Sequence, residues 1–192
     1  MANKDIIVIG ASHGGIEAMK EFVSGLPEGF HASVLLVQHS SSTAPGMLPR
    51  ILMKAGPLPA SFPADFEPLD PGHIYVAPPD YHMILERGLV RLTRGPKENH
   101  VRPAIDPLFR SAAYAYGPRV VGVVLTGLLN DGTAGLWAVK DRGGTAIVQD
   151  PEEAIAPSMP QSALQNVEVD YCLPLGDIAP LLARLARGSA KG

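Results

Sequence analysis

An apolar run followed by a glycine-rich turn, close to the N-terminus, most constrains what this chain can fold into. Residues 6–9 read Ile-Ile-Val-Ile, residues 10–15 read Gly-Ala-Ser-His-Gly-Gly, and an amphipathic stretch begins at Ile16. This order predicts a buried strand, a tight turn and the start of a helix. The glycines let the backbone bend sharply around Ser12, and the amides that open the helix would face whatever binds beside its hydroxyl.

Three interpretations of the turn at Ser12 are open from this segment alone. It could cradle a phosphate, although Ser12 stands where the motif G-x-G-x-x-G has its second glycine, and no Gly-Lys-Ser/Thr follows. Ser12 could instead be a nucleophile on a strand-to-helix elbow, beside a set of N–H donors. It could also be an ordinary helix N-cap, a common position for serine.

The composition favours one domain with a sizeable core. The chain has 192 residues, of which 46% are hydrophobic and 18% charged, and no polar low-complexity stretch divides it. We expect the domain to span residues 5–186, with frayed ends at residues 1–4 and 187–192.

Charge and hydropathy exclude several classes of partner. The net charge is −3 and no run of Lys or Arg occurs, so nothing indicates nucleic acid or an anionic lipid surface. No apolar run reaches the ~18 residues that cross a bilayer, and the N-terminus has no secretory signal pattern. We therefore expect a cytoplasmic protein without direct membrane insertion.

Cysteine and histidine usage gives no metal-binding pattern. The single cysteine, Cys172, allows neither an internal disulfide nor a cysteine cluster, and we expect it to pack as a small apolar residue. His73 and His82 share no metal-ligand spacing with each other or with His39, so we expect both to be structural hydrogen-bonding groups. Cysteine and histidine spacing therefore gives no indication of a metal site.

Strand and helix patterns alternate along the rest of the chain, with glycine or proline at most of the joins. This alternation predicts a three-layer, doubly wound α/β fold with a mostly parallel sheet, and a β-hairpin at one margin. The expected strands are 32–39, 74–77, 120–125, 145–149 and 169–173, with a further short one within 61–66; the hairpin strands are 81–85 and 89–93; the expected helices are 16–25, 47–54, 103–116, 136–142, 157–164 and 178–186.

Three polar residues follow predicted strands at their carboxyl ends, where ligand sites of open α/β sheets collect. They are Ser12, His39 and Asp131. Serine needs an adjacent base to become a nucleophile, and the imidazole needs a third group to hold its tautomer. Taken singly, however, His39 could be a solvated loop histidine, and Asp131 could be a turn residue capping the helix that begins at Gly132.

Five ordered motifs resemble the catalytic domain of the CheB-type chemotaxis protein-glutamate methylesterases, and the resemblance runs from about Asp5 to Ala186. The motifs are Gly-Ala-Ser-His-Gly-Gly at 10–15, Val-Gln-His at 37–39, Pro-Gly-His-Ile-Tyr-Val-Ala-Pro at 71–78 with His82-Met83, Arg-Pro-Ala-Ile-Asp at 102–106, and Leu-Thr-Gly-Leu-Leu-Asn-Asp-Gly at 125–132.

The resemblance implies a cofactor-free serine hydrolase that demethylates γ-glutamyl methyl esters on chemoreceptor cytoplasmic domains, and often deamidates receptor glutamines. By motif position, Ser12 would be the nucleophile, His39 the general acid and base, and Asp131 its orienting carboxylate. The backbone N–H of Leu128, where the family usually has methionine, would help to bind the oxyanion.

The chain departs from the usual family pattern in four respects. His13 replaces a threonine beside the serine; its imidazole could compete for the hydrogen bond of the serine or contact the substrate, and we expect it to be tolerated as a rim residue. Ser40-Ser41 replaces a Met-Pro pair, and Leu128-Leu129 replaces Met-Gly. The family's N-terminal receiver domain is absent from this sequence. We therefore expect activity without an in-chain phosphorylation switch, which leaves room for a receiver domain acting in trans.

Two rival functions stay open. The chain could be a serine esterase or amidase with a small-molecule substrate. It could also be a non-catalytic module in which residues 10–15 hold an anion, although the serine, histidine and aspartate together argue against that.

Overall fold

The structure is a computed structural model that describes residues 3–187. Within them a seven-stranded sheet is formed by β1 (Ile6–Ala11), β2 (Ser33–Gln38), β3 (Ala60–Ser61), β5 (Ile74–Val76), β8 (Val120–Val124), β9 (Thr145–Gln149) and β10 (Tyr171–Leu173). The helices are α1 (Gly15–Ser24), α2 (Leu48–Ala55), α3 (Ile105–Tyr116), α4 (Thr133–Asp141), α5 (Ser158–Asn166) and α6 (Leu175–Ala186), with a 3-10 turn at Gly117–Arg119.

The seven strands lie in the order β10-β9-β8-β1-β2-β5-β3, and every neighbouring pair is parallel. The central strands are continuous apolar runs because both faces of a parallel sheet are covered by helices. From β1 the chain passes first to β2 on one side and later to β8 on the other. The carboxyl end of β1 is therefore a topological switch point, where α/β folds bind ligands.

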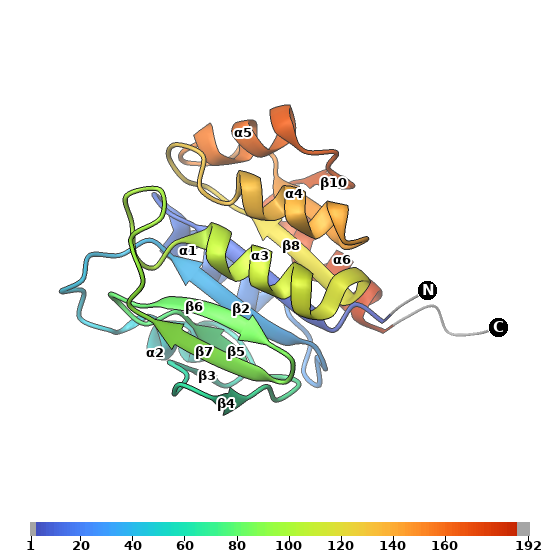
Figure 1. Ribbon diagram of the computed structural model, residues 1–192. Helices are drawn as coiled ribbons and strands as arrows, with labels where there is room; N and C mark the ends of the chain where they lie inside the picture. The colour runs from blue at the N-terminus through green and yellow to red at the C-terminus, as the bar shows by residue number, and fades with distance from the viewer. Residues whose placement is uncertain (1–2, 188–192) are drawn as a thin grey trace.

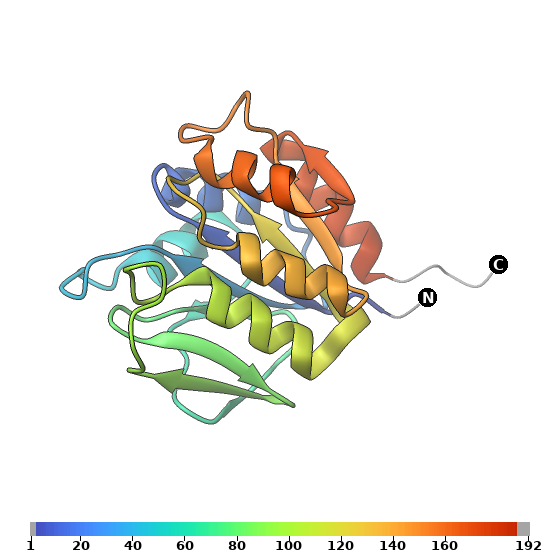
Figure 2. The same cartoon turned by 45° about the horizontal axis from the view of Figure 1, so that its top comes forward.

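Helices cover both faces of this sheet, giving the expected three layers (Figure 1). One apolar core packs α1, α2 and α6 against the sheet, and a second core packs α3, α4 and α5 against its other face. Figure 2 shows α3 and α4 side by side across the second face. The predicted fold class is confirmed.

The predicted hairpin is present as β6 (His82–Glu86) and β7 (Leu89–Thr93), but it is not hydrogen-bonded to the seven-stranded sheet. Together with β4 (Glu67–Pro68) it forms a separate antiparallel sheet in the order β4-β7-β6. Its buried residues Met83, Leu85 and Val90 join the core that contains α3. The hairpin has one apolar face to bury, and it buries that face against a helix.

Two local expectations were wrong. Within the segment 61–66 only Ser61 belongs to a strand, as the second residue of β3, and residues 62–66 connect β3 to β4. Cys172 does not pack into the core: it is exposed on β10, which lies at the edge of the sheet, so only part of its surroundings is protein.

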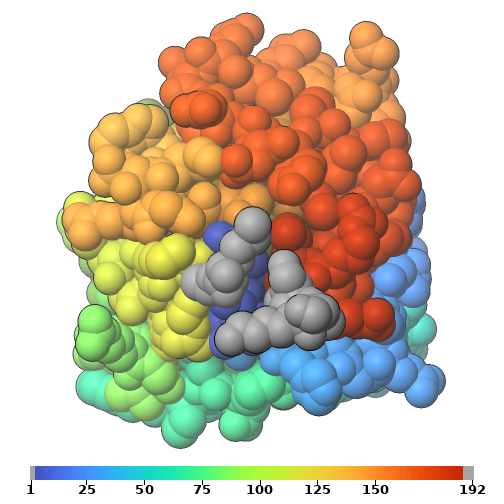
Figure 3. Space-filling view, turned by 90° about the vertical axis from the view of Figure 1, so that its right-hand side faces the viewer, coloured from blue at the N-terminus to red at the C-terminus, as the bar shows by residue number. Residues whose placement is uncertain are grey.

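The parallel strands all begin at one end of the sheet and have their carboxyl ends at the other. Figure 3 views the end at which β1 begins, with α6 covering one side of it. The strands run from this end to the opposite one, where their carboxyl ends lie (Figure 1). The predicted frayed segments fall mostly outside the described residues. In residues 3–187 no helix is long and apolar enough to cross a membrane.

Candidate active site

Ser12, His39 and Asp131 follow three adjacent strands and line one cavity. Ser12 follows β1, His39 follows β2, and Asp131 lies in the loop after β8; β1 lies between the other two strands. The cavity has a volume of about 790 Å³ and includes all three residues in its lining. The parallel strands thus bring together residues that are up to 119 positions apart.

Backbone hydrogen bonds fix the turn at Ser12, and the Ser12 hydroxyl has no hydrogen-bond partner among residues 3–187. Ser12 N donates to Thr126 O at 2.9 Å, and Ser12 O accepts from Gly15 N at 2.9 Å and Gln38 Nε2 at 2.8 Å. The N-cap of α1 is Gly14, with φ 77°, and no side chain caps this helix. The N-cap interpretation of Ser12 is therefore wrong.

Gly15 is required at this turn because the Gln38 carboxamide fills the space beside it. A Cβ at position 15 would meet Gln38 Oε1 at 2.0 Å and Ala11 Cβ at 2.7 Å. We expect Gly15→Ala to lower the free energy of unfolding by roughly 2 kcal/mol, as overpacking in a core does. Chemical denaturation measures the change. The matched control is Gly95→Ala, whose Cβ would meet only Thr93 Oγ1 at 3.6 Å; equal stability of the two variants would contradict this account.

His39 is paired with Asp131 through a short hydrogen bond, 2.6 Å from Nε2 to Oδ2. The histidine side chain is 15% exposed and the aspartate 2%. An ionised carboxylate only accepts, so Nε2 carries the hydrogen in the neutral ring and Nδ1 is free to accept a proton.

Asp131 is held by three further donors. Its Oδ2 also accepts from Ile105 N at 2.7 Å, and its Oδ1 accepts from Asp106 N at 3.1 Å and Asn99 Nδ2 at 2.7 Å. The two amides open α3, so Asp131 caps α3 and not the helix after it, contrary to the structural alternative. Burial alone would raise the pKa of Asp131, but the hydrogen bonds from His39, Ile105 and Asp106 outweigh burial and lower it.

Asp106 makes the reciprocal contact with α4. Its Oδ1 accepts from Gly132 N at 3.0 Å and from Gly135 N at 2.7 Å. Asp131, in the loop before α4, therefore caps α3, and Asp106, in the first turn of α3, caps α4. Burial, and next the negative charge of Asp131, raise the pKa of Asp106 above its ordinary value.

Two backbone N–H groups beside Ser12 are free to bind an anion. Within residues 3–187 no hydrogen bond occupies the N–H of Leu128 or that of His13. Both residues line a second cavity, of about 470 Å³, together with Ser12 and His39. Leu129, next in the chain, is 73% exposed and has φ 64°, an unusual conformation for leucine.

His73 and His82 lie outside the site and make structural hydrogen bonds, as expected. His73 Nε2 lies 2.7 Å from Ser61 Oγ. His82 is buried between Pro96 O, 2.9 Å from its Nε2, and Ala104 N, which donates to its Nδ1 at 3.2 Å. Among residues 3–187 there is no group of three or more His, Cys, Asp or Glu that could hold a metal ion.

Sequence reasoning gave no role to Asn99 or Asp106, although both contact Asp131. An acidic residue in the first turn of a predicted helix is a recognisable signal, and Asp106 has that position in α3, but the signal does not reveal that its carboxylate caps α4. Nothing local marked Asn99, which lies in a polar loop.

Comparison with known proteins gives one consistent family. The family model described as CheB methylesterase matches residues 7–182. A Leptospira interrogans protein, provisionally named protein-glutamate methylesterase/protein-glutamine glutaminase, is 41% identical over 184 residues, covering 95% of each chain. A Rhodospirillum rubrum protein with the same two activities in its name is 40% identical over 188 residues, which cover 95% of this chain and 49% of that protein.

A solved structure shows the same fold. The CheB methylesterase catalytic domain of Thermotoga maritima superposes with a TM-score of 0.90 at 35% identity, covering 96% of this chain and all of that one.

Proposed function

Because this chain belongs to the CheB methylesterase family, we propose that it is a serine hydrolase acting on γ-glutamyl methyl esters of chemoreceptor cytoplasmic domains. The observation that carries the proposal is the 2.6 Å bond between His39 and Asp131, in a cavity that Ser12 also lines. A hydroxyl, an imidazole and a buried carboxylate in one cavity are the parts that acyl transfer requires.

In the proposed mechanism, Ser12 Oγ attacks the glutamyl γ-carbonyl carbon while His39 Nδ1 accepts the hydroxyl proton. Asp131 stabilises the imidazolium that forms. The imidazolium gives its proton to the departing methoxide, so that methanol leaves and an acyl-enzyme remains. Water then attacks the acyl carbon, again with His39 as base, and Ser12 recovers its proton as the glutamate is released.

The oxyanion is held by the N–H groups of Leu128 and His13 in this proposal. No hydrogen bond to the part of the chain that the structure describes occupies either N–H, and both residues line the cavity beside Ser12. Such donors stabilise charge that develops only in the transition state.

The same machinery would deamidate receptor glutamines, with ammonia in place of methanol. The support is that the relatives from Leptospira interrogans and Rhodospirillum rubrum carry both activities in their names.

The test of this function is a comparison of three substrates under one set of conditions: methylated receptor membranes, receptor with the target glutamines, and a p-nitrophenyl ester. We expect methanol release from the first. Hydrolysis of the small ester with no action on either receptor would instead favour a small-molecule esterase. Absence of labelling by a fluorophosphonate, together with thermal stabilisation by phosphate, would favour an anion-binding module.

We expect His13→Thr to leave kcat for methanol release within about threefold of the wild type. The His13 side chain is exposed, and the contacts of this residue with the core run through its backbone, whose carbonyl accepts from Thr126 Oγ1 at 2.9 Å. Replacing an exposed side chain changes little unless it touches the reacting groups. A fall of a hundredfold in kcat would show that the imidazole takes part in the reaction.

A further inference from the structure

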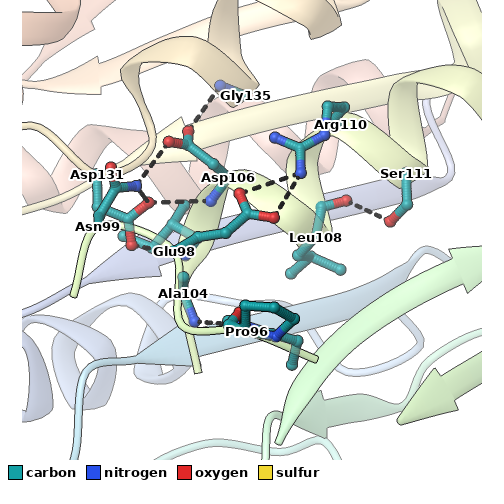
Figure 4. Close-up of polar contacts among 12 residues, drawn as sticks. Pro96, Glu98, Asn99, Ala104, Asp106, Leu108, Arg110, Ser111, Asp131 and Gly135 are labelled. Carbon is teal, nitrogen blue, oxygen red and sulfur yellow. Dashed lines mark hydrogen bonds and ion pairs between the residues drawn. The ribbon is translucent and has the colours of Figure 1, made fainter. Parts of the chain in front are cut away.

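A hydrogen-bonded bridge joins Asp131 to a second buried carboxylate. Asn99 Nδ2 donates to Asp131 Oδ1 at 2.7 Å and to Asp106 Oδ2 at 2.8 Å, and Figure 4 shows the three side chains together. Carboxylates only accept, so the amide nitrogen must face both, with one hydrogen for each. We propose that Asn99, anchored on Asp106, is a positioning residue that orients Asp131 toward His39.

The backbone around Asn99 adopts an unfavourable conformation that aims its carboxamide inward. Asn99 and His100 have φ of 51° and 65°, and Val101 N closes the turn on Glu98 O at 3.0 Å. Two successive non-glycine residues at positive φ make this a type I′ turn, and each costs energy that other contacts must offset. Asparagine is one of the residues that tolerates this conformation best.

An ion pair fixes the turn to α3. Arg110 Nη2 on α3 donates to both carboxylate oxygens of Glu98, at 2.8 and 3.1 Å (Figure 4). Asn99 is the next residue after Glu98, so the turn and the helix whose amides hold Asp131 form one unit.

Packing in the core does not account for the position of Asn99 between Asp131 and Asp106. The residue is exposed and lines the same cavity as Ser12 and His39. Within residues 3–187 its amide is the sole donor to Asp106 Oδ2. The amide also places a hydrogen-bond donor between the carboxylates of Asp131 and Asp106, which are buried close together. What it supplies is a fixed orientation for Asp131 Oδ1, which leaves Oδ2 facing His39.

This inference rests on the proposed triad, and Asn99→Ala tests it. We expect kcat for methanol release to fall about tenfold, with KM within about twofold of the wild type. Without its anchor, Asp131 is free to turn away from His39 and stabilises the imidazolium less, so the acid limb of kcat/KM should move to lower pH. Asn99→Asp, which keeps the shape but adds a negative charge that favours the imidazolium, should move the acid limb in the opposite direction, to higher pH.

The titration of the His39 ring, followed by NMR in both variants, provides a readout that does not depend on turnover. It separates His39 from the other titratable groups around the cavity, Asp106, His13 and His100. A loss of global stability would leave this titration unmoved, and so would the loss of a substrate contact.

The control is Asn166→Ala on α5, which removes a bond to Ser162 O; neither residue lines the cavities at Ser12, and the variant should have wild-type kinetics and titration. An Asn99→Ala enzyme with kcat within twofold of wild type and an unmoved His39 titration would overturn the inference, as would a loss confined to KM. If Ser12→Ala kept full turnover, the proposed serine-hydrolase mechanism would fail instead, and the His39 titration would still decide the role of Asn99.

Discussion

Replacing Ser12 by alanine is expected to reduce methanol release from methylated receptors by a factor on the order of 10⁴ or more, because no acyl-enzyme can form. The fold should persist. Within residues 3–187 the Ser12 hydroxyl makes no hydrogen bond, and the backbone groups that fix the turn are unchanged. Methanol release and fluorophosphonate labelling should both be lost, while denaturation midpoints stay close to those of the wild type.

The matched control for this variant is Ser24→Ala, in the last turn of the same helix that Ser12 precedes. Ser24 Oγ donates to Glu21 O at 2.7 Å, and the residue is exposed. This variant should keep wild-type turnover and labelling. Turnover by Ser12→Ala that approached the level of Ser24→Ala would rule out Ser12 as the nucleophile.

Asp131→Asn is expected to lower kcat by about 10³ to 10⁴. All four partners of the carboxylate are donors, so the new NH₂ group has no acceptor to face. Asn99 cannot offer its amide oxygen as an acceptor for this NH₂ group, because the oxygen would then also face the carboxylate of Asp106. His39 can adapt by moving its hydrogen to Nδ1, but that nitrogen can then no longer accept the proton of Ser12.

The electrostatics of this variant can be checked apart from its turnover. Because the charge of Asp131 raises the pKa of Asp106, neutralising Asp131 should move the pKa of Asp106 back toward its ordinary value. Carboxyl NMR titration measures this. Asp141→Asn, at an exposed position 3.8 Å from Arg142, is the control and should leave both kcat and the titration of Asp106 unchanged. A kcat within tenfold of the wild type in Asp131→Asn would remove Asp131 from the proposed triad.

Local sequence patterns predicted the strands, the helices and the positions at which the strands end. Ser12 and His39 could be singled out because they lie at two of those ends. Apolar runs bounded by glycine or proline predicted the strands of the main sheet, and parallel strands align their carboxyl ends at one edge. The same reasoning failed for Cys172, because a short apolar run does not reveal whether its strand lies at the centre or the edge of a sheet. Local patterns also predicted the hairpin, but not that it belongs to a separate sheet, because periodicity alone does not reveal which surface an amphipathic strand covers.

The amino-acid sequence by itself determined the order of strands and helices, the α/β class and the serine and histidine at two strand ends. Only the tertiary structure decided which helix Asp131 caps, that Asp106 caps the other, and that Asn99 lies between them. The physical reason is that helix ends and polar loops leave donors and acceptors that many partners could satisfy. Which partner does so depends on contacts between segments 25 to 32 residues apart in the chain, such as Asn99 with Asp131.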